Sequence, residues 1–398
     1  MKLAQRIARI KPSATLAVSA KAKALKQQGI QVVNFGVGEP DFDTPQHIQE
    51  AAVAAMKKGE TRYTAVNGID ELKEAVCRVI ERDYGLSYSK PEVLISCGGK
   101  HALYNLFQAT LDPGDEVIIP SPFWVSYPDM VALADGNPVM VACSERNGFK
   151  LDPDDLERAI TPRTRMLIMN SPSNPTGVHY SRSELAALAE VLRKHEQVLI
   201  VSDDIYNRIL FQGQEWMNLA MLDERLRKRT FIVNGVSKTY CMTGWRIGYL
   251  VGDAAVIRAA GDIQSQSTSN PTSIAQWAAV AALNGDQSGV DKMVGIFEHR
   301  CRYVMDRLAK LPGVTCPTPS GAFYVFPNIS CYFGKTDGRT TITNSLDMAG
   351  FLLEQCHAAV VPGVAFGEDR CIRFSYALSM DDLKAGFDGI EKGLASLS

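Results

Sequence analysis

The chain has no segment suited to crossing a membrane and no charge excess suited to nucleic acid. Its apolar runs fall well short of the roughly 20 residues that span a bilayer. The formal net charge is only -2 over 398 residues, which argues against non-specific binding to nucleic acid. We therefore expect neither a membrane nor a nucleic acid among its partners.

Paired cysteines and metal-binding patterns are also missing. The nine cysteines are odd in number and scattered, none forms a Cys-x-x-Cys pair, and the six histidines are dispersed. No zinc pattern results. Unpaired thiols are typical of a reducing compartment, so the sequence predicts a cytoplasmic protein with buried thiols and no metal site.

Two glycine-rich turns fall short of the nucleotide-binding fingerprints. Gly36-Val37-Gly38 is soon followed by Pro40, which forbids the helix that a dinucleotide fingerprint needs. Gly98-Gly99-Lys100 has neither the spacing of a P-loop nor the Ser or Thr that follows its lysine. Two glycines between a strand and a helix still leave amides free at the helix N-terminus, which is a weaker signal for a phosphate.

The length of the chain and its alternating elements predict two domains. At 398 residues the chain exceeds what one core supports. Strands and helices alternate from residue 91 to residue 251, which predicts an α/β fold with a doubly wound, mostly parallel sheet covered on both faces. A long helix over residues 287–311 then leads into a smaller α+β unit. Its strands are expected at residues 313–315, 323–326 and 372–375.

Three connecting segments can be interpreted from their composition. The N-terminus carries no acid before Glu39, as in a transit peptide, but a helix predicted over residues 19–28 and ended by Gly29 favours a structural segment. Thr44 precedes a proline and is expected to be the N-cap of the next helix. Residues 263–271 are predicted to form a polar loop between helices.

A lysine lies at the end of a predicted buried strand. The strand over residues 231–233 breaks at Asn234-Gly235, and Ser237-Lys238 follows directly. An ammonium there would lose hydration unless it were paired or neutralised. A desolvated lysine is partly neutral and nucleophilic, and it can form an imine with a carbonyl. The alternative is an ordinary surface lysine in a loop.

Other polar and aromatic residues also follow predicted strands. Asp203 and Asp204 are adjacent after a strand over residues 198–201, and both cannot be buried comfortably, so we expect one to face a cation and the other solvent. A pyridinium nitrogen is one such cation, and a metal or a helix cap is the alternative. Trp124 lies just past a strand end, where it could stack on a planar ligand or cap the core.

These segments, in their order, resemble the class I and II aminotransferases, which use pyridoxal phosphate (PLP). The resemblance rests on Ser237-Lys238 with Arg246 between two glycines, on Asn174-Pro175-Thr176-Gly177, and on the Asp-x-x-Tyr spacing of Asp203 and Tyr206. It implies the PLP-dependent transferase fold of type I. It also implies a large PLP-binding domain over residues 46–290 and a small domain over 291–398, which an N-terminal segment, 1–45, joins.

The resemblance assigns a role to each part of the site. Lys238 would bind the cofactor covalently and carry the proton, while Asp203 would meet the ring nitrogen, with Asp204 as its rival. Trp124 would stack on the ring. Asn174 and Tyr206 would contact the phenolic oxygen. The phosphate would be held by Gly99, Lys100, Ser237, Arg246 and the Tyr63 of a second subunit, which makes a homodimer the expected assembly.

Substrate recognition is also implied by the resemblance. Arg373, rather than Arg370, is expected to bind the α-carboxylate, and the substrate is expected to contact Gly38, Trp124 and Asn174 as well. In one branch of the family an arginine in the loop that corresponds to residues 265–270 binds the distal carboxylate of aspartate. This loop contains no arginine here. A second branch resembles the chain through Gly98-Gly99-Lys100 and through Lys11-Pro12-Ser13-Ala14-Thr15.

In that second branch the lysine meets the distal acid, with the threonine nearby. Lys100 therefore has two interpretations, as part of the phosphate site or as the selector of acidic substrates, and the second is favoured. The expected reaction moves the amino group of L-aspartate to 2-oxoglutarate and forms oxaloacetate and L-glutamate. The alternatives are an aminotransferase for prephenate, aromatic substrates or alanine, and a PLP-dependent β-lyase.

Overall fold

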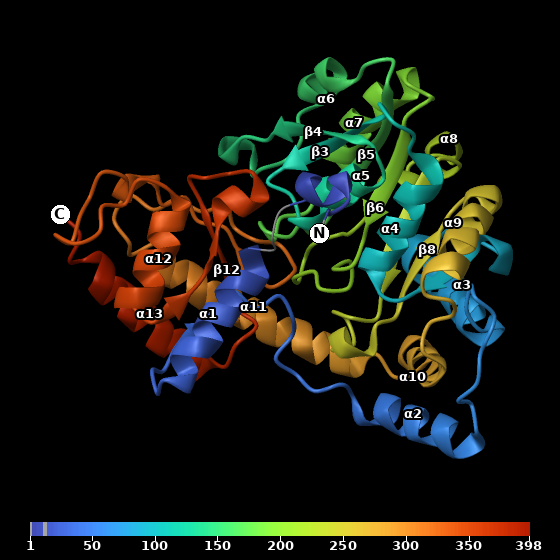
Figure 1. The fold of residues 1–398 in the computed structure, drawn as a ribbon, viewed down its shortest axis with the longest axis horizontal. Helices are drawn as coiled ribbons and strands as arrows, with labels where there is room; N and C mark the ends of the chain where they lie inside the picture. Colours follow the sequence, from blue (N-terminus) through green and yellow to red (C-terminus); the bar gives the residue numbers. More distant parts are fainter. Residues whose placement is uncertain (1, 11–13) are drawn as a thin grey trace.

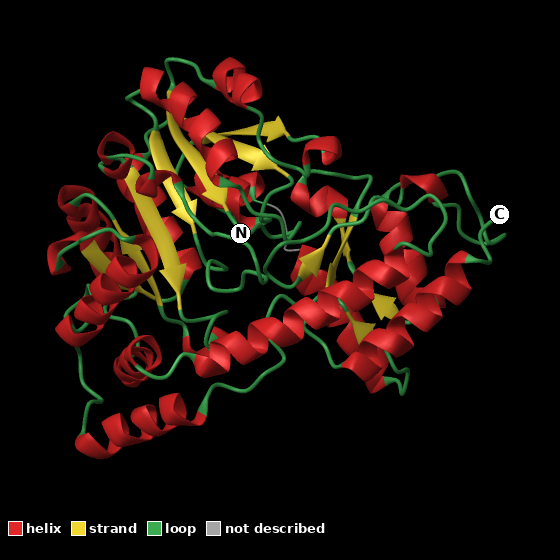
Figure 2. Ribbon diagram, turned by 180° about the vertical axis from the view of Figure 1, so that it is seen from behind, coloured by secondary structure: helices red, strands yellow, loops and turns green. Residues whose placement is uncertain are grey.

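The protein consists of a large sheet covered by helices and a smaller unit beside it (Figures 1 and 2). The structure is a computed structural model that describes residues 2–10 and 14–398. The long helix α11 (Ser288–Leu308) runs from one part to the other. None of the described helices is long and apolar enough to cross a bilayer.

The large sheet has seven strands in the order β2-β8-β7-β6-β5-β3-β4. All neighbours from β7 to β4 are parallel, and only β8 runs against its neighbours. The central strands are almost continuously buried, because helices cover both faces. The strands are β2 (Val93–Ser96), β3 (Glu116–Ser121), β4 (Asn137–Ala142), β5 (Thr164–Asn170), β6 (Leu199–Asp203), β7 (Thr230–Gly235) and β8 (Gly248–Val251).

Three apolar clusters join the helices to this sheet. Leu103 and Phe107 pack on one face of the strands, and Leu188 and Leu192 pack on the other. A third cluster lies among α2, α3 and α10. The helices are α2 (Gln46–Lys58), α3 (Asp70–Tyr84), α4 (Gly99–Thr110), α5 (Ser126–Leu133), α6 (Pro153–Ala159), α7 (Arg182–Lys194), α8 (Glu224–Arg227), α9 (Ala254–Ser267) and α10 (Ser273–Asn284).

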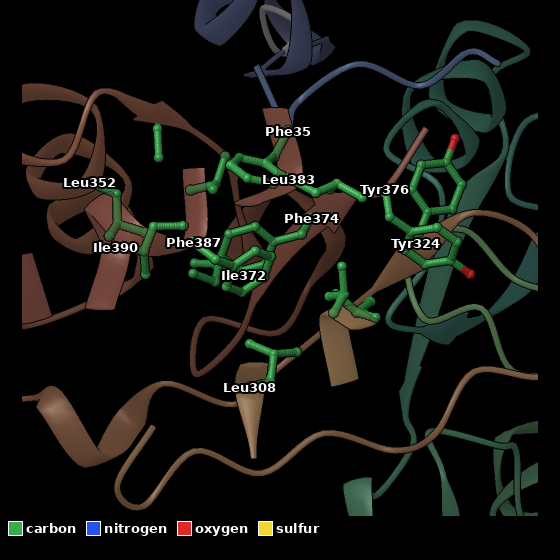
Figure 3. Close-up of a cluster of buried hydrophobic side chains, with 14 of the residues drawn as sticks. Phe35, Leu308, Tyr324, Leu352, Ile372, Phe374, Tyr376, Leu383, Phe387 and Ile390 are labelled. Carbon is green, nitrogen blue, oxygen red and sulfur yellow. The ribbon is translucent and has the colours of Figure 1, made fainter. Parts of the chain in front are cut away.

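The smaller unit is built from both ends of the chain. β1 (Val33–Asn34) pairs with β10 (Ala358–Ala359), so the N-terminal segment joins the C-terminal unit. Phe35 packs edge-on against Phe374 and Phe387, at centroid distances of 5.3 and 5.7 Å (Figure 3). The remaining elements are α1 (Ala14–Gln27), β9 (Tyr324–Val325), α12 (Ser345–Gln355), β11 (Val361–Pro362), β12 (Ile372–Ser375) and α13 (Met380–Leu394). The domain boundaries at residues 45 and 290 stay a prediction.

The structure shortens the polar loop expected over residues 263–271, which begins only after Ser267. Helix α9 continues to Ser267, because the polar side chain of Gln264 is a buried structural group. Its Nε2 donates to the carbonyl oxygens of Val66 and Ile95, at 2.7 and 2.8 Å. Polar composition therefore misled the prediction, since this polarity satisfies buried backbone rather than facing water.

Two smaller expectations were also wrong. Pro45, not Thr44, is the N-cap of α2, and the Thr44 Oγ1 instead donates to the carbonyl oxygen of Cys241 at 2.6 Å. Residues 313–315 form no strand; only Thr315 makes a single bridge, with Asn328. Residues 11–13, which carry part of the resemblance, lie outside the described residues.

Candidate active site

One cavity of about 210 Å³ lies beyond the carboxyl ends of β5, β6 and β7, and the smaller unit closes it with residues of β9 and β12. Ligand sites of open α/β sheets form at this edge. Every residue that the sequence predicted for the site lines the cavity, except Tyr63. The lining residues are Gly38, Gly99, Lys100, Trp124, Tyr127, Asn170, Asn174, Asp203, Ile205, Tyr206, Ser237, Lys238, Thr243, Arg246, Tyr324 and Arg373.

Lys238 directs its amine into this cavity. It follows the buried strand β7, and its Nζ donates to the carbonyl oxygen of Gly38 at 2.6 Å. Withdrawal from water lowers the pKa of the Lys238 amine to about 8, although the nearby Glu39 opposes this shift. An appreciable fraction of the amine is therefore neutral and nucleophilic near neutral pH.

Asp203 and Asp204 point to different partners. The Tyr127 hydroxyl donates to Asp203 Oδ2 at 2.6 Å beside the cavity, and burial raises the pKa of Asp203 to about 6. Asp204 accepts from Ser202 Oγ at 2.6 Å and from Asn218 Nδ2 at 2.9 Å, away from the cavity. Both side chains are buried, so the expectation that one of them faces solvent was wrong.

Arg373 enters from the smaller unit, on β12. Its Nη1 donates to Asn174 Oδ1 at 3.0 Å and its Nη2 to the carbonyl oxygen of Gly36 at 2.8 Å. The guanidinium is buried, its Nε is without a hydrogen-bond partner, and within the described chain no carboxylate forms an ion pair with it. Its competitor Arg370 pairs with Glu368 at 2.7 Å and does not line the cavity. Arg373 is therefore a free cation for an anionic ligand.

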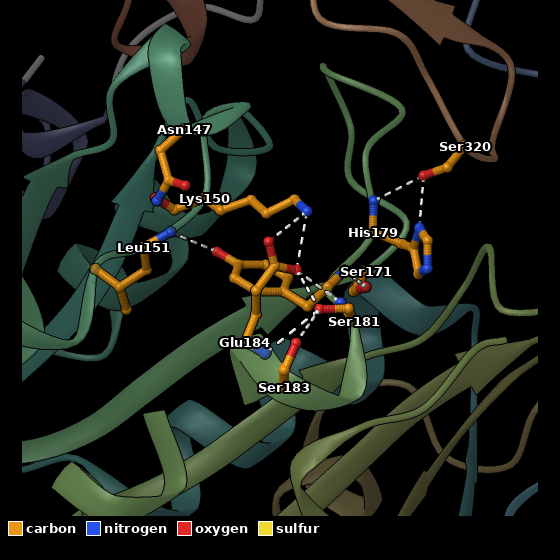
Figure 4. Close-up of polar contacts among 10 residues, drawn as sticks. Asn147, Lys150, Leu151, Ser171, His179, Ser181, Ser183, Glu184 and Ser320 are labelled. Carbon is orange, nitrogen blue, oxygen red and sulfur yellow. Dashed lines mark hydrogen bonds and ion pairs between the residues drawn. The ribbon is translucent and has the colours of Figure 1, made fainter. Parts of the chain in front are cut away.

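The loop that carries Asn174 is fastened to the smaller unit (Figure 4). The backbone amide of His179 donates to Ser320 Oγ at 3.1 Å, and the His179 Nδ1 lies 2.6 Å from the same oxygen. The amide of Ser320 donates to the carbonyl oxygen of Gly177 at 2.9 Å. These bonds place Asn174 against Arg373, although the two residues are far apart in the sequence.

Arg246 and the start of α4 form the opposite end of the cavity. Arg246 Nη1 donates to the carbonyl oxygen of Thr243 at 2.7 Å, and its Nη2 donates to that of Cys97 at 3.3 Å. A Cβ on Gly98 would lie 2.4 Å from Arg246 Nη2, so only glycine lets the guanidinium approach the helix N-terminus. With Gly99 amides and the Ser237 hydroxyl nearby, this end suits an anion.

Lys100 lies beside Trp124 at the mouth of the cavity. Its Nζ is 5.0 Å from the centroid of the Trp124 ring. Partial loss of water and, second, the charge of Arg246 lower the pKa of the Lys100 amine. Trp124 itself packs edge-on against Tyr127, at a centroid distance of 5.3 Å.

Comparison with known proteins finds similar sequences along nearly the whole chain. A family model described as aminotransferase class I and II matches residues 30–390. The chain belongs to this family. It is 52% identical over 397 residues to an aspartate/prephenate aminotransferase of Cereibacter sphaeroides, covering 100% of this chain and 99% of the relative. It is 50% identical to an aspartate aminotransferase of Geobacillus stearothermophilus, covering 98% of each chain.

Solved structures of aspartate aminotransferases share this fold. The Rhizobium meliloti protein superposes with a TM-score of 0.97 at 44% identity and covers 100% of both chains. The Thermus thermophilus protein with maleate gives 0.92 at 41% identity, covering 99% of this chain and 100% of that one. The predicted fold type and the assignment as a PLP-dependent aminotransferase are confirmed.

The cavity of this aminotransferase fits PLP chemically. Asp203 is a buried carboxylate without a cationic partner in its hydrogen bonds, as a protonated pyridine nitrogen would require. Arg246 and the α4 N-terminus supply donors for a phosphate, and the Lys238 amine is available for an aldehyde. A carboxylate for the ring nitrogen, donors for the phosphate and an amine for the aldehyde therefore line one cavity.

Sequence reasoning missed several lining residues of the aminotransferase, and its assignment of Tyr63 to the site of a second subunit stays a prediction. Tyr127 lies in the first turn of α5, three residues after Trp124, and its nearness to that predicted site residue could have indicated it. Tyr324 lies in a continuously buried run around the strand β9, and this pattern gave no signal of function. Tyr63 is 91% exposed and does not reach the cavity of its own chain. Asn170, Ile205 and Thr243 were also missed.

Proposed function

We propose that this aminotransferase moves the amino group of L-aspartate to 2-oxoglutarate and forms oxaloacetate and L-glutamate. The observation that carries the proposal is the buried guanidinium of Arg373, which no carboxylate of the described residues pairs with, in the same cavity as the Lys238 amine. Relatives near 50% identity named aspartate aminotransferase support this substrate.

PLP supplies a carbonyl that condenses with amino groups and a ring that takes up electrons from the substrate's Cα. Asp203 would keep the ring nitrogen protonated, because a carboxylate beside it favours the charged form. Asn174 and Tyr206 would hold the phenolic oxygen, and Trp124 would stack on the ring. The phosphate would be held by Gly99, Ser237, Arg246 and the Tyr63 of a second subunit.

Lys238 would move the proton in the reaction. Once released from the cofactor, its amine can take the proton from the substrate's Cα and return it to the C4′ carbon. Arg373 would hold the α-carboxylate, with Gly38 and Asn174 beside it, and so fix the Cα–H toward Lys238. The depressed pKa of the Lys238 amine suits both directions of this transfer.

Lys100 would choose acidic substrates. Its amine lies at the mouth of the cavity, held over Trp124, where a second carboxylate of aspartate or 2-oxoglutarate could meet it. The alternative role, in the phosphate site, would not distinguish aspartate from alanine. A further candidate acceptor is prephenate, which the name of the 52% identical relative favours.

We further propose a cytoplasmic homodimer. The loop that carries the exposed Tyr63 follows α2, whose Val53 and Met56 are also exposed, and a second copy of the chain would cover these apolar side chains. The nine cysteines are all free thiols, which supports a reducing compartment.

A half-reaction screen tests this function. Purified protein loaded with PLP is mixed with single amino acids, and conversion of its absorbance to that of pyridoxamine phosphate is timed. We expect aspartate and glutamate to react faster than alanine, and Lys100→Ala to lose the advantage of aspartate. Lys58→Ala is the matched control, because the Lys58 amine lies 5.4 Å from the Trp277 ring outside the cavity. Equal losses toward aspartate and alanine in Lys100→Ala would refute the selector role.

A further inference from the structure

Tyr324 is a buried side chain of the cavity to which the proposed mechanism gives no part. It lies on β9, its side chain is fully buried, and it comes from the smaller unit. Its backbone is fixed through the pairing with Ser375 on β12, the strand that carries Arg373. Tyr324 therefore moves with Arg373, while its hydroxyl reaches a residue that follows the large sheet.

Among the residues that the structure describes, the side chain hydrogen-bonded to the Tyr324 hydroxyl is that of Tyr206. The two phenol oxygens are 2.9 Å apart, and the rings meet edge-on with centroids 5.7 Å apart. A Cβ on Gly38 would lie 3.2 Å from the Tyr324 oxygen, so glycine leaves this hydroxyl room beside the cavity. At this distance one hydroxyl donates its proton to the oxygen of the other. If Tyr206 donates into the cavity, Tyr324 must donate to Tyr206.

The ring of Tyr324 contacts Arg373. The guanidinium carbon lies 4.6 Å from the ring centroid, within the range of a cation–π contact. Burial raises the pKa of both phenols, well above the usual range for Tyr206, and the charge of Arg373 opposes the shift in each. The guanidinium lies against the Tyr324 ring, so its charge favours the Tyr324 hydroxyl as the donor of the pair.

We infer that Tyr324 is a positioning residue that joins the carboxylate-binding arginine to the Tyr206 phenol. Its hydroxyl turns the Tyr206 proton toward the cavity, and its ring holds the Arg373 guanidinium. Each contact uses a different part of one side chain. The inference rests on the proposed function, in which Tyr206 donates to the phenolic oxygen of PLP and Arg373 binds the α-carboxylate.

The two parts can be tested separately with Tyr324→Phe and Tyr324→Leu. The first readout is the pH midpoint of the visible absorbance of bound cofactor, without substrate. A hydrogen bond donated to an acidic oxygen favours its deprotonated state, so a weaker bond raises the midpoint. The second readout is the dissociation constant of succinate, a dicarboxylate without an amino group.

We expect Tyr324→Phe to raise the midpoint by about half a pH unit, the effect of one hydrogen bond, and to change succinate binding less than about twofold. Tyr324→Leu should raise the midpoint as well and weaken succinate binding at least about fivefold, since the ring under Arg373 is lost. In a Tyr206→Phe background, Tyr324→Phe should cause no further shift.

Tyr376→Phe is the matched control. Tyr376 lies at the same end of the core cluster in Figure 3 and is equally buried, but its hydroxyl faces the carbonyl oxygen of Ala322, at 3.4 Å, and it does not line the cavity. An unchanged midpoint in Tyr324→Phe, an equal shift in Tyr376→Phe, or an additive shift in the Tyr206→Phe background would overturn the inference. A wild-type protein that binds no PLP would overturn the proposed function, and this inference with it.

Discussion

Asp203 is a buried carboxylate that lines the cavity. Its carboxylate is buried with one strong donor, the Tyr127 hydroxyl, and burial raises its pKa to about 6. The adjacent Asp204 is also buried, and its pKa is raised to about 7, yet it has two side-chain donors. Only Asp203 of the two lines the cavity, so only its ionised form could be stabilised by a cation bound there.

The stability of the cofactor-free protein should depend on this residue. Because the pKa of Asp203 is raised on folding, the folded protein holds the proton more tightly, and stability falls as pH rises from about 4 through about 6. The full cost, about 2–3 kcal/mol, is present at pH 8. We expect Asp203→Asn to raise the melting temperature of the cofactor-free protein at pH 8 but not at pH 4, while it weakens cofactor binding.

Thermal unfolding at both pH values measures this effect. Asp204→Asn is the comparison: the pKa of Asp204 is raised as well, so this variant relieves a similar burial cost, but it also disturbs the hydrogen bonds from Ser202 and Asn218. A lower melting temperature for Asp203→Asn at pH 8 than for the wild type would contradict the electrostatic account.

At the scale of elements, the sequence predicted those segments in which periodicity and burial agree. The strands β6 and β7 fall where the sequence predicted strands over residues 198–201 and 231–233, and the lysine follows β7 as expected. The prediction failed at α9, because a buried Gln264 has the composition of a loop but serves as a hydrogen-bond centre. Local pattern gives no information on such tertiary partners.

The turn before α4 shows a related limit. The sequence indicated a weak phosphate cradle at Gly98-Gly99, but the reason for the first glycine is tertiary. Gly98 has a φ of 90°, and a Cβ there would meet the Arg246 guanidinium. The arginine is distant in sequence, and no local pattern places it above this turn.

Gly98→Ala should therefore displace Arg246 and weaken PLP binding about tenfold, the effect of one lost charged hydrogen bond, as measured by titration of cofactor-free protein. Gly85→Ala is the control, because Gly85 also has a positive φ, of 67°, with nothing near its missing Cβ. Both variants should lose about 1 kcal/mol or more of stability from backbone strain. Equal cofactor affinity in the two variants would contradict the role given to Gly98.

At the scale of the whole molecule, the site depends on the two parts being held together. Asn174 lies in the loop that follows β5 of the large sheet, and Arg373 lies on β12 of the smaller unit. The bonds of His179 and Gly177 to Ser320 fasten one part to the other. The order of motifs along the chain indicated that these residues share a site. Their distances could not be predicted, because they are fixed by contacts between segments far apart in sequence.

The proposed homodimer adds one more contributor, Tyr63. If Tyr63 completes the site of the partner subunit, Tyr63→Ala and Lys238→Ala lie in different sites of a mixed dimer. Dimers co-expressed with two tags and purified as heterodimers should regain about half the wild-type activity at limiting PLP, because one of two sites is complete. Heterodimers no more active than the two parent variants would contradict a shared site.

The most direct test of the account concerns Lys238 itself. Protein loaded with PLP is reduced with borohydride, which fixes an imine as a stable amine, and it is then digested for mass spectrometry. The account predicts that the cofactor mass lies on the peptide that contains Lys238, and that Lys238→Ala binds PLP without any fixed adduct. Cofactor fixed on another lysine, such as Lys100, or Lys238→Ala with full transamination, would contradict it.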